Sequence, residues 1–128
     1  MAKPEIEFSD VNTVDWTPVE GRVAGLWERI LARDDEGGTV TRILRFEPGT
    51  DTTANGVQEH SYWEEVYILE GSLHDVTLDQ TFPAGSYACR PPGMRHGPWL
   101  APDGCLTFEV RYIAGSTPHP GGSGGRSR

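Results

Sequence analysis

Glycine and proline interrupt this chain so often that no long helix has room to form. Its 128 residues include 16 glycines and 10 prolines, many of them in clusters such as Pro48-Gly49 and Pro91-Pro92-Gly93. The apolar stretches between the clusters are short, and residues 39–46 and 106–113 alternate with a period of two. Short strands with turns roughly every 8–12 residues are typical of a β-sandwich or barrel. The sequence therefore predicts an all-β fold.

The charge balance limits the partners of the chain. Eleven Lys and Arg stand against nineteen Asp and Glu, which gives a net charge of −8. Because such a surface repels phosphate groups, we expect neither a nucleic-acid nor a membrane partner. The first residues lack the apolar stretch of a signal peptide and no apolar run reaches the roughly 20 residues of a membrane helix, so we expect a cytoplasmic protein.

The composition changes near Ser116. Residues 116–128 contain no large apolar side chain, and we expect them to form a flexible Gly/Ser/Pro-rich tail. Residues 1–115 have the length of a single domain. The two cysteines, Cys89 and Cys105, form neither a disulfide framework nor a C-x-x-C pair, and we expect reduced thiols.

Two segments carry side chains of the types that bind metal ions in proteins. Gln58, His60 and Glu64 have the same parity, so on a strand their side chains face the same way. His96 follows the Pro-Pro-Gly turn, where a new strand begins. Together the four side chains would fill four positions around one divalent ion and leave one or two for water or substrate. Taken singly, a histidine in a β protein is more often a surface or hydrogen-bonded residue, and paired glutamates usually form a solvated face.

Together these segments resemble the two motifs of the cupin superfamily, whose members are jelly-roll β-barrels of two antiparallel sheets. The first motif, G-x5-H-x-H-x3-4-E-x6-G, matches residues 58–71 at His60, Glu64 and Gly71. The second motif, G-x5-P-x-G-x2-H-x3-N, matches residues 85–96 at Gly85, Pro91, Gly93 and His96. The resemblance implies that residues 1–115 form one cupin domain, with its glycines in turns of positive φ.

Three positions depart from the cupin motifs. Thr52 stands at the opening glycine, Leu100 at the closing asparagine and Gln58 at the first ligand histidine. A carboxamide oxygen is a weaker donor than imidazole, so Gln58 lowers the affinity for the metal and shifts the metal preference. Type I phosphomannose isomerases, which are also cupins, use a similar Gln-x-His with Glu and His, so this substitution is compatible with an active site.

Within the superfamily the chain is similar to stand-alone bacterial cupins of the ChrR-like group. The likeness lies in residues 64–75, in the Pro-Ala-Gly and Pro-Pro-Gly-x-x-His segments, and in Gly104-Cys105. Members resemble the cupin half of zinc-binding anti-sigma factors and the dihydroxyacetophenone-type dioxygenases. The sequence lacks the Cys- and His-rich helical half of the anti-sigma factors, which favours an enzyme over a transcriptional regulator.

The resemblance implies a mononuclear metal enzyme that acts on a small polar organic molecule. Its cofactor would be one divalent transition metal ion, Fe2+ or Zn2+, with Ni2+ or Mn2+ as further options. Dioxygenase chemistry is the first expectation. A non-redox isomerase, lyase or hydrolase is an alternative, and so is a non-catalytic cupin that senses a small ligand or a metal.

Aromatic and arginine side chains near the motifs are candidate substrate-binding residues, because small ligands are held by apolar walls and carboxylates by arginine. They are Tyr62, Trp63, Trp99, Phe108, Arg45, Arg95 and Arg111. Core packing of the aromatic rings and surface ion pairs of the arginines are the alternatives. By parity, Val66 and Ile68 form a hydrophobic floor beneath the metal.

We also expect a homodimer. Antiparallel sandwiches expose edge strands that need protection, and cupins commonly pair strands of two subunits. Residues 23–31, which include Trp27, are the candidate covering segment.

Overall fold

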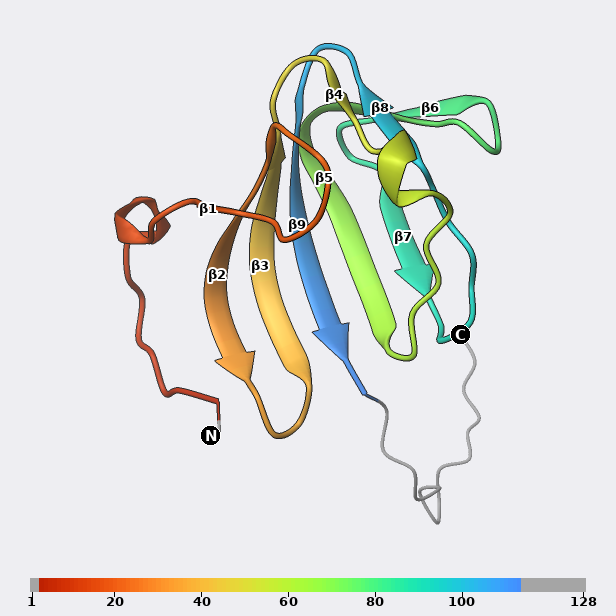
Figure 1. Ribbon diagram of the computed structural model, residues 1–128. Helices are drawn as coiled ribbons and strands as arrows, with labels where there is room; N and C mark the ends of the chain where they lie inside the picture. Colours follow the sequence, from red (N-terminus) through yellow and green to blue (C-terminus); the bar gives the residue numbers. More distant parts are fainter. Residues whose placement is uncertain (1–2, 114–128) are drawn as a thin grey trace.

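A computed structural model describes residues 3–113, whose regular structure is almost entirely strand (Figure 1). Two 3-10 turns, η1 (Val11–Thr13) and η2 (Thr53–Asn55), are the helical elements of this part of the chain, which contains no helix able to span a membrane. The strands are β1 (Thr17–Pro18), β2 (Leu26–Asp34), β3 (Thr39–Phe46), β4 (Thr50–Asp51), β5 (Trp63–Asp75), β6 (Gln80–Pro83), β7 (Tyr87–Arg90), β8 (Trp99–Ala101) and β9 (Cys105–Tyr112). The all-β prediction is confirmed, whereas the predicted tail lies outside the described residues.

The strands form one curled antiparallel sheet that folds over on itself into two layers. The main path runs β1-β2-β3-β9-β5-β8-β4, and β6 and β7 pair with β5 beside it. In Figure 1, β2, β3, β9, β5 and β7 lie side by side, and β4, β8 and β6 gather at the top of the view. Residues 63–71 of β5 pair with β9, residues 64–67 also pair with β7, and the last residues pair with β6 and β8. Strand β5 therefore belongs to both layers.

Strand β5 continues through a cluster of turn-forming residues. The cluster Glu70-Gly71-Ser72 predicts a turn between two strands, but β5 runs through it with a register shift between Ile68 and Glu70. Gly71 has a φ of +76°, and a Cβ at this position would collide with the carbonyl oxygen of Gly104. The absence of a side chain thus lets β5 bend from one layer into the other without ending.

Alternation along the strands sends one set of side chains into the barrel. The apolar members pack at one end: Leu26, Leu44, Phe46, Ile68, Leu73, Ala101 and Cys105. Further along the same inner face, the buried side chains are charged, among them Arg42, Glu64 and Glu109. Val66 is 6% exposed and Ile68 4% exposed, which confirms their predicted inward orientation.

Candidate metal centre

The register of β9, β5 and β7 places Glu64 between two arginines. Glu64 lies opposite Arg111 of β9 and opposite Arg90 of β7. Arg111 Nε donates to Glu64 Oε2 at 3.0 Å, and Arg90 Nη1 donates to Oε1 at 3.1 Å. The side chain of Glu64 is buried, with 5% of its surface exposed. The sheet thereby fixes the position of the carboxylate and balances its charge.

Backbone hydrogen bonds hold the two histidine segments together. Gln58 N donates to His96 O at 2.7 Å and His96 N donates to Gln58 O at 3.0 Å, so the two residues form one antiparallel bridge. Side chains of such an opposed pair lie on the same face. A third bond, from Gly93 N to His60 O at 2.9 Å, ties the Pro-Pro-Gly turn to the first segment. This pairing brings the rings of His60 and His96 to a centroid distance of 4.9 Å.

The predicted ligands His60, Glu64 and His96 converge. Each offers one ligand atom, and these atoms lie within 4.8 Å of one another. His96 Nδ1 lies 3.3 Å from the carbonyl oxygen of Met94, and since a carbonyl only accepts, Nδ1 carries the proton. The other nitrogen, Nε2, presents its lone pair 3.6 Å from Glu64 Oε1. Two acceptors that face each other in this way suit a cation between them.

The spacing fits a first-row divalent ion. Ligand atoms about 2.0–2.2 Å from one tetrahedral ion lie about 3.3–3.6 Å from one another, so the three donors need to close by up to about 1.5 Å. A carboxylate offers about four lone-pair sites. Arg90 and Arg111 each take one site, on different oxygens of Glu64, so each oxygen keeps a site for the ion.

All three groups have the protonation state that metal binding requires. Burial lowers the pKa of His60 and of His96, so both rings are neutral near pH 7. Burial works to raise the pKa of Glu64, but the charges of Arg111 and Arg90 outweigh it and hold this pKa below its ordinary value. No proton therefore competes with a metal ion at neutral pH.

Gln58 lines the same cavity as the three converging residues. Its side-chain nitrogen donates to the carbonyl oxygen of Asn55 at 2.8 Å, which leaves Oε1 as the remaining donor atom of the side chain. Ligation by Gln58 stays a prediction.

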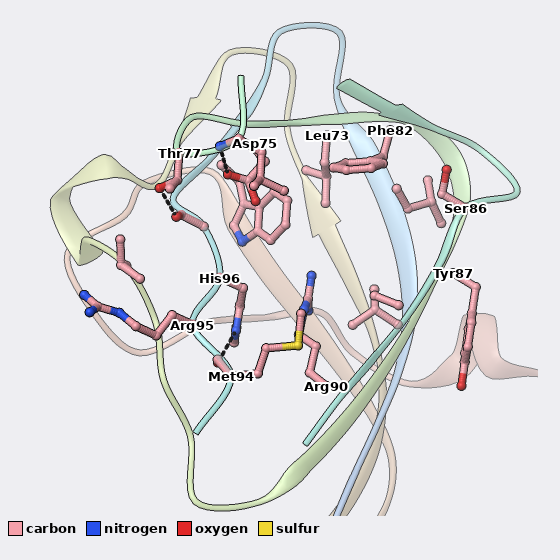
Figure 2. Close-up of a pocket in the computed structure, with 17 residues that line it drawn as sticks. Leu73, Asp75, Thr77, Phe82, Ser86, Tyr87, Arg90, Met94, Arg95 and His96 are labelled. Atoms are coloured by element: carbon pink, nitrogen blue, oxygen red, sulfur yellow. Dashed lines mark hydrogen bonds between the residues drawn. The ribbon is translucent and has the colours of Figure 1, made fainter. Parts of the chain in front are cut away.

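Two cavities meet at this site. The polar cavity, of about 440 Å³, contains the three converging residues and reaches the inner faces of β2, β3 and β9. The apolar cavity, of about 430 Å³, lies between β5, β6 and β7 on one side and residues 94–99 on the other (Figure 2). Arg90, His96 and Trp99 line both cavities.

Four of the predicted substrate-binding residues line these cavities. Tyr62 stacks on His60 with a centroid distance of 4.5 Å, and the guanidinium of Arg111 lies 5.0 Å from the centre of the Tyr62 ring. These two residues border the polar cavity. Arg95 borders the apolar cavity, and Trp99 borders both.

The other three predicted substrate-binding residues line neither cavity, because they alternate with inward residues. Trp63 precedes the inward Glu64 and stacks on Tyr112 at 6.3 Å. Phe108 lies between the buried Thr107 and Glu109 and therefore faces the other way. Arg45 lies between the buried Leu44 and Phe46, and its guanidinium covers the ring of Trp16 at 4.9 Å.

Several charged residues of the interior are not predicted by the sequence pattern. Arg90 contacts Glu64 directly, and Arg42 holds the carboxylates of Glu28 and Glu109 with bonds of 2.6 to 3.1 Å. Parity with Ala88 could have placed Arg90 inside. Its contact with Glu64, however, depends on the register between β5 and β7, which no local pattern reveals.

Comparisons with known proteins identify the domain. A family model described as the ChrR cupin-like domain matches residues 5–112. No curated protein matches the chain. An RmlC-like cupin from Shewanella frigidimarina is 21% identical, with a TM-score of 0.69 over 91% of this chain and 97% of that one. The likeness confirms the predicted cupin jelly roll.

Two further solved structures share this fold. The polyketide cyclase RemF from Streptomyces resistomycificus is 20% identical, with a TM-score of 0.70 over 86% of this chain and 81% of that one. An acetylacetone dioxygenase from Acinetobacter johnsonii is 19% identical, with a TM-score of 0.65 over 88% of this chain and 75% of that one. At such identities these similarities establish the fold alone.

Proposed function

We propose, since this chain belongs to the ChrR cupin-like family, that it is a mononuclear metal enzyme with dioxygenase chemistry on a small organic molecule. The observation that carries this proposal is the convergence of His60, Glu64 and His96 within 4.8 Å. Two histidines and one carboxylate that leave other positions open are the ligand set of non-haem iron oxygenases. The acetylacetone dioxygenase with the same fold supports this choice.

The residues around the candidate ligands prepare them for this role. A bound divalent ion would supply Lewis acidity toward an oxygen of the substrate and, as iron, a partner for O2. Met94 fixes the tautomer of His96 through its carbonyl oxygen, and Tyr62 holds the His60 ring by stacking. Arg90 and Arg111 fix both oxygens of Glu64.

A non-redox reaction is the second candidate, and Gln58 favours it. A neutral carboxamide at this position is a weaker donor to late first-row ions than imidazole. The polyketide cyclase RemF, which shares the fold, supports an isomerase or lyase of this kind.

Metal analysis and oxygen uptake test the proposal together. Protein purified without chelator is analysed for metal, reloaded with Fe2+ under nitrogen, and then assayed for O2 consumption with small 1,3-diketones and aromatic ketones. We expect about one ion per chain and substrate-dependent O2 uptake, both lost in His96→Ala. The matched control is His74→Ala, because His74 lines neither cavity and contacts Thr81 and Asp79 instead.

The oxygen-uptake assay distinguishes the dioxygenase reaction from the non-redox reaction. Conversion of a substrate without O2 uptake would favour the non-redox reaction. Metal content that is the same in wild type and His96→Ala would contradict the proposal.

A further inference from the structure

We propose that the apolar cavity binds the substrate, and that this substrate is a small monoanion with an apolar body whose anionic group is held by Arg90. The inference rests on the proposed function and adds the class of substrate and the residue that selects it.

The wall of the cavity is built from inward side chains of β5, β6, β7 and β8. Its apolar members are Val66, Ile68, Leu73, Phe82, Ala88 and Trp99. A volume of about 430 Å³ lies within the range of roughly 300–1,000 Å³ that small-molecule pockets occupy. Such a wall favours an apolar body, because water leaves apolar surface on both partners when they meet.

The mouth of the cavity is also apolar. Val57, Leu78 and Met94 line the cavity while 40%, 62% and 44% of their surfaces are exposed. Large apolar side chains grouped around an opening are typical of binding sites on soluble proteins. The flexible thioether of Met94 can adapt to ligands of different shape.

The charged residues of the cavity favour an anion. They are Arg90, Arg95 and Asp75, which together give one net positive charge. Figure 2 shows Asp75 at the opposite end of the cavity from Arg90. Asp75 Oδ1 already accepts a hydrogen bond from Leu78 N at 3.0 Å. An anionic group beside Arg90 therefore stays away from this carboxylate.

Among the inward arginines, Arg90 has the free donors that such an anion requires. Arg42 uses Nε, Nη1 and Nη2 on carboxylates, and Arg111 lines only the polar cavity. Within residues 3–113, Arg90 makes one hydrogen bond, from Nη1 to Glu64. A guanidinium has five N–H donors, so Arg90 can hold an oxyanion in addition to Glu64.

The surroundings of Arg90 orient it toward both the cavity and the candidate metal centre. Its guanidinium lies 5.2 Å from the centre of the Trp99 ring, and 11% of its side-chain surface is exposed. Because Arg90 contacts Glu64, an anionic group on Arg90 lies beside the candidate ligands. The apolar body then occupies the cavity beyond Trp99.

Calorimetric titration of zinc-loaded protein with three probes tests the inference. The probes are benzoate, its neutral isostere benzamide, and acetate, which has the charge without the apolar body. We expect benzoate to bind at least tenfold more tightly than either of the others. Arg90→Gln should weaken benzoate about tenfold or more and change benzamide less than threefold, as expected for the loss of a charge-assisted hydrogen bond.

Two further variants serve as controls. Arg111→Gln also removes a donor to Glu64 but leaves the apolar cavity unchanged, so benzoate affinity should change less than threefold. Ala88→Leu fills the cavity and should weaken benzoate and benzamide alike. Zinc content and circular dichroism of every variant show whether the site and fold persist.

Any one of three results would overturn the inference. The protein could bind benzoate and benzamide equally well, Arg90→Gln and Arg111→Gln could lose the same amount of benzoate affinity, or benzoate could fail to bind. Zinc content is measured separately, so failure of the proposed metal site is distinguishable. If the protein takes up no zinc, the same titrations on the metal-free protein still decide whether Arg90 selects an anion.

Discussion

The two ends of the barrel interior are built from the same strands but serve different purposes. At one end, β3 and β5 contribute Leu44, Phe46 and Ile68 to a packed apolar core. At the other end, the same strands contribute Arg42 and Glu64, which are 6% and 4% exposed. Burial of apolar groups stabilises the fold, whereas burial of charge costs stability unless every charge has a partner. Core packing alone therefore does not account for the charged end, where each buried charge has to be matched by a partner.

The charged end is organised as two sets of paired charges. Arg42 contacts Glu28 and Glu109, and Glu64 contacts Arg90 and Arg111. The second set includes Glu64 of the converging triad, and its Arg90 lines the apolar cavity, which no member of the first set does. We infer that the first set supports the barrel and the second supports the site.

The largest effect is expected at the apolar end. Phe46→Ala removes a ring that is 5% exposed and leaves a cavity in the core. It should lower the free energy of unfolding by about 3–5 kcal/mol, the usual cost of such a truncation. Urea denaturation followed by circular dichroism measures this loss. A loss below about 1 kcal/mol would show that this end is not the core.

Arg42→Met tests whether the first charged set is structural. The substitution leaves Glu28 and Glu109 without their cation, and we expect a loss of about 3 kcal/mol in the free energy of unfolding. Adding Glu109→Leu removes one of the two unpaired carboxylates and should recover part of the lost free energy of unfolding. Urea denaturation of the single and double variants checks both expectations. A single variant as stable as wild type would remove the distinction between the two charged sets.

His60→Ala should affect binding rather than stability. Its ring is half-buried outside the apolar core, so the metal-free variant should lose less than about 1 kcal/mol of unfolding free energy. Zinc affinity should fall at least about 100-fold, because one of three ligands is lost. Zinc titration measures the affinity, and urea denaturation of the same samples measures the free energy of unfolding. Unfolding of the variant would instead show that this end is structural.

The smallest effect is expected at Gln58. If its amide oxygen is a ligand, Gln58→Ala should weaken zinc binding about tenfold, and Gln58→His should match or exceed wild type, because imidazole is the stronger donor. Zinc titration of the wild type and the two variants measures the order of their zinc affinities. Equal affinities would mean that Gln58 is not a ligand and that His60, Glu64 and His96 act alone.

The sequence predicted inward apolar residues and the candidate metal ligands more readily than the side chains that contact those ligands. Alternation alone placed Val66 and Ile68 inside, and motif spacing selected His60, Glu64 and His96, which the fold brings together. The inward positions of Val66 and Ile68 follow from alternation along β5, whereas residues 59–62 are not in a strand and the pairing of Gln58 with His96 brings the histidines together.

Features that depend on pairing between strands were missed or misplaced. Trp63 was expected to line the pocket as an aromatic side chain near the motifs, but it precedes the inward Glu64, and adjacent residues on a strand face opposite ways. The contact of Arg90 with Glu64 depends on how β7 aligns with β5, and the continuity of β5 through Gly71 depends on packing against Gly104. The homodimer and the cytoplasmic location stay predictions.

X-ray absorption at the zinc edge of zinc-loaded protein tests whether His60, Glu64 and His96 bind one metal ion. We predict one ion with nitrogen and oxygen neighbours at about 2.0–2.2 Å and the scattering signature of two imidazoles, from His60 and His96. In excess zinc, any ion that His96→Ala still binds should show at most one imidazole. Sulfur neighbours at about 2.3 Å, from Cys89 or Cys105, or an unchanged spectrum in the variant would contradict the account.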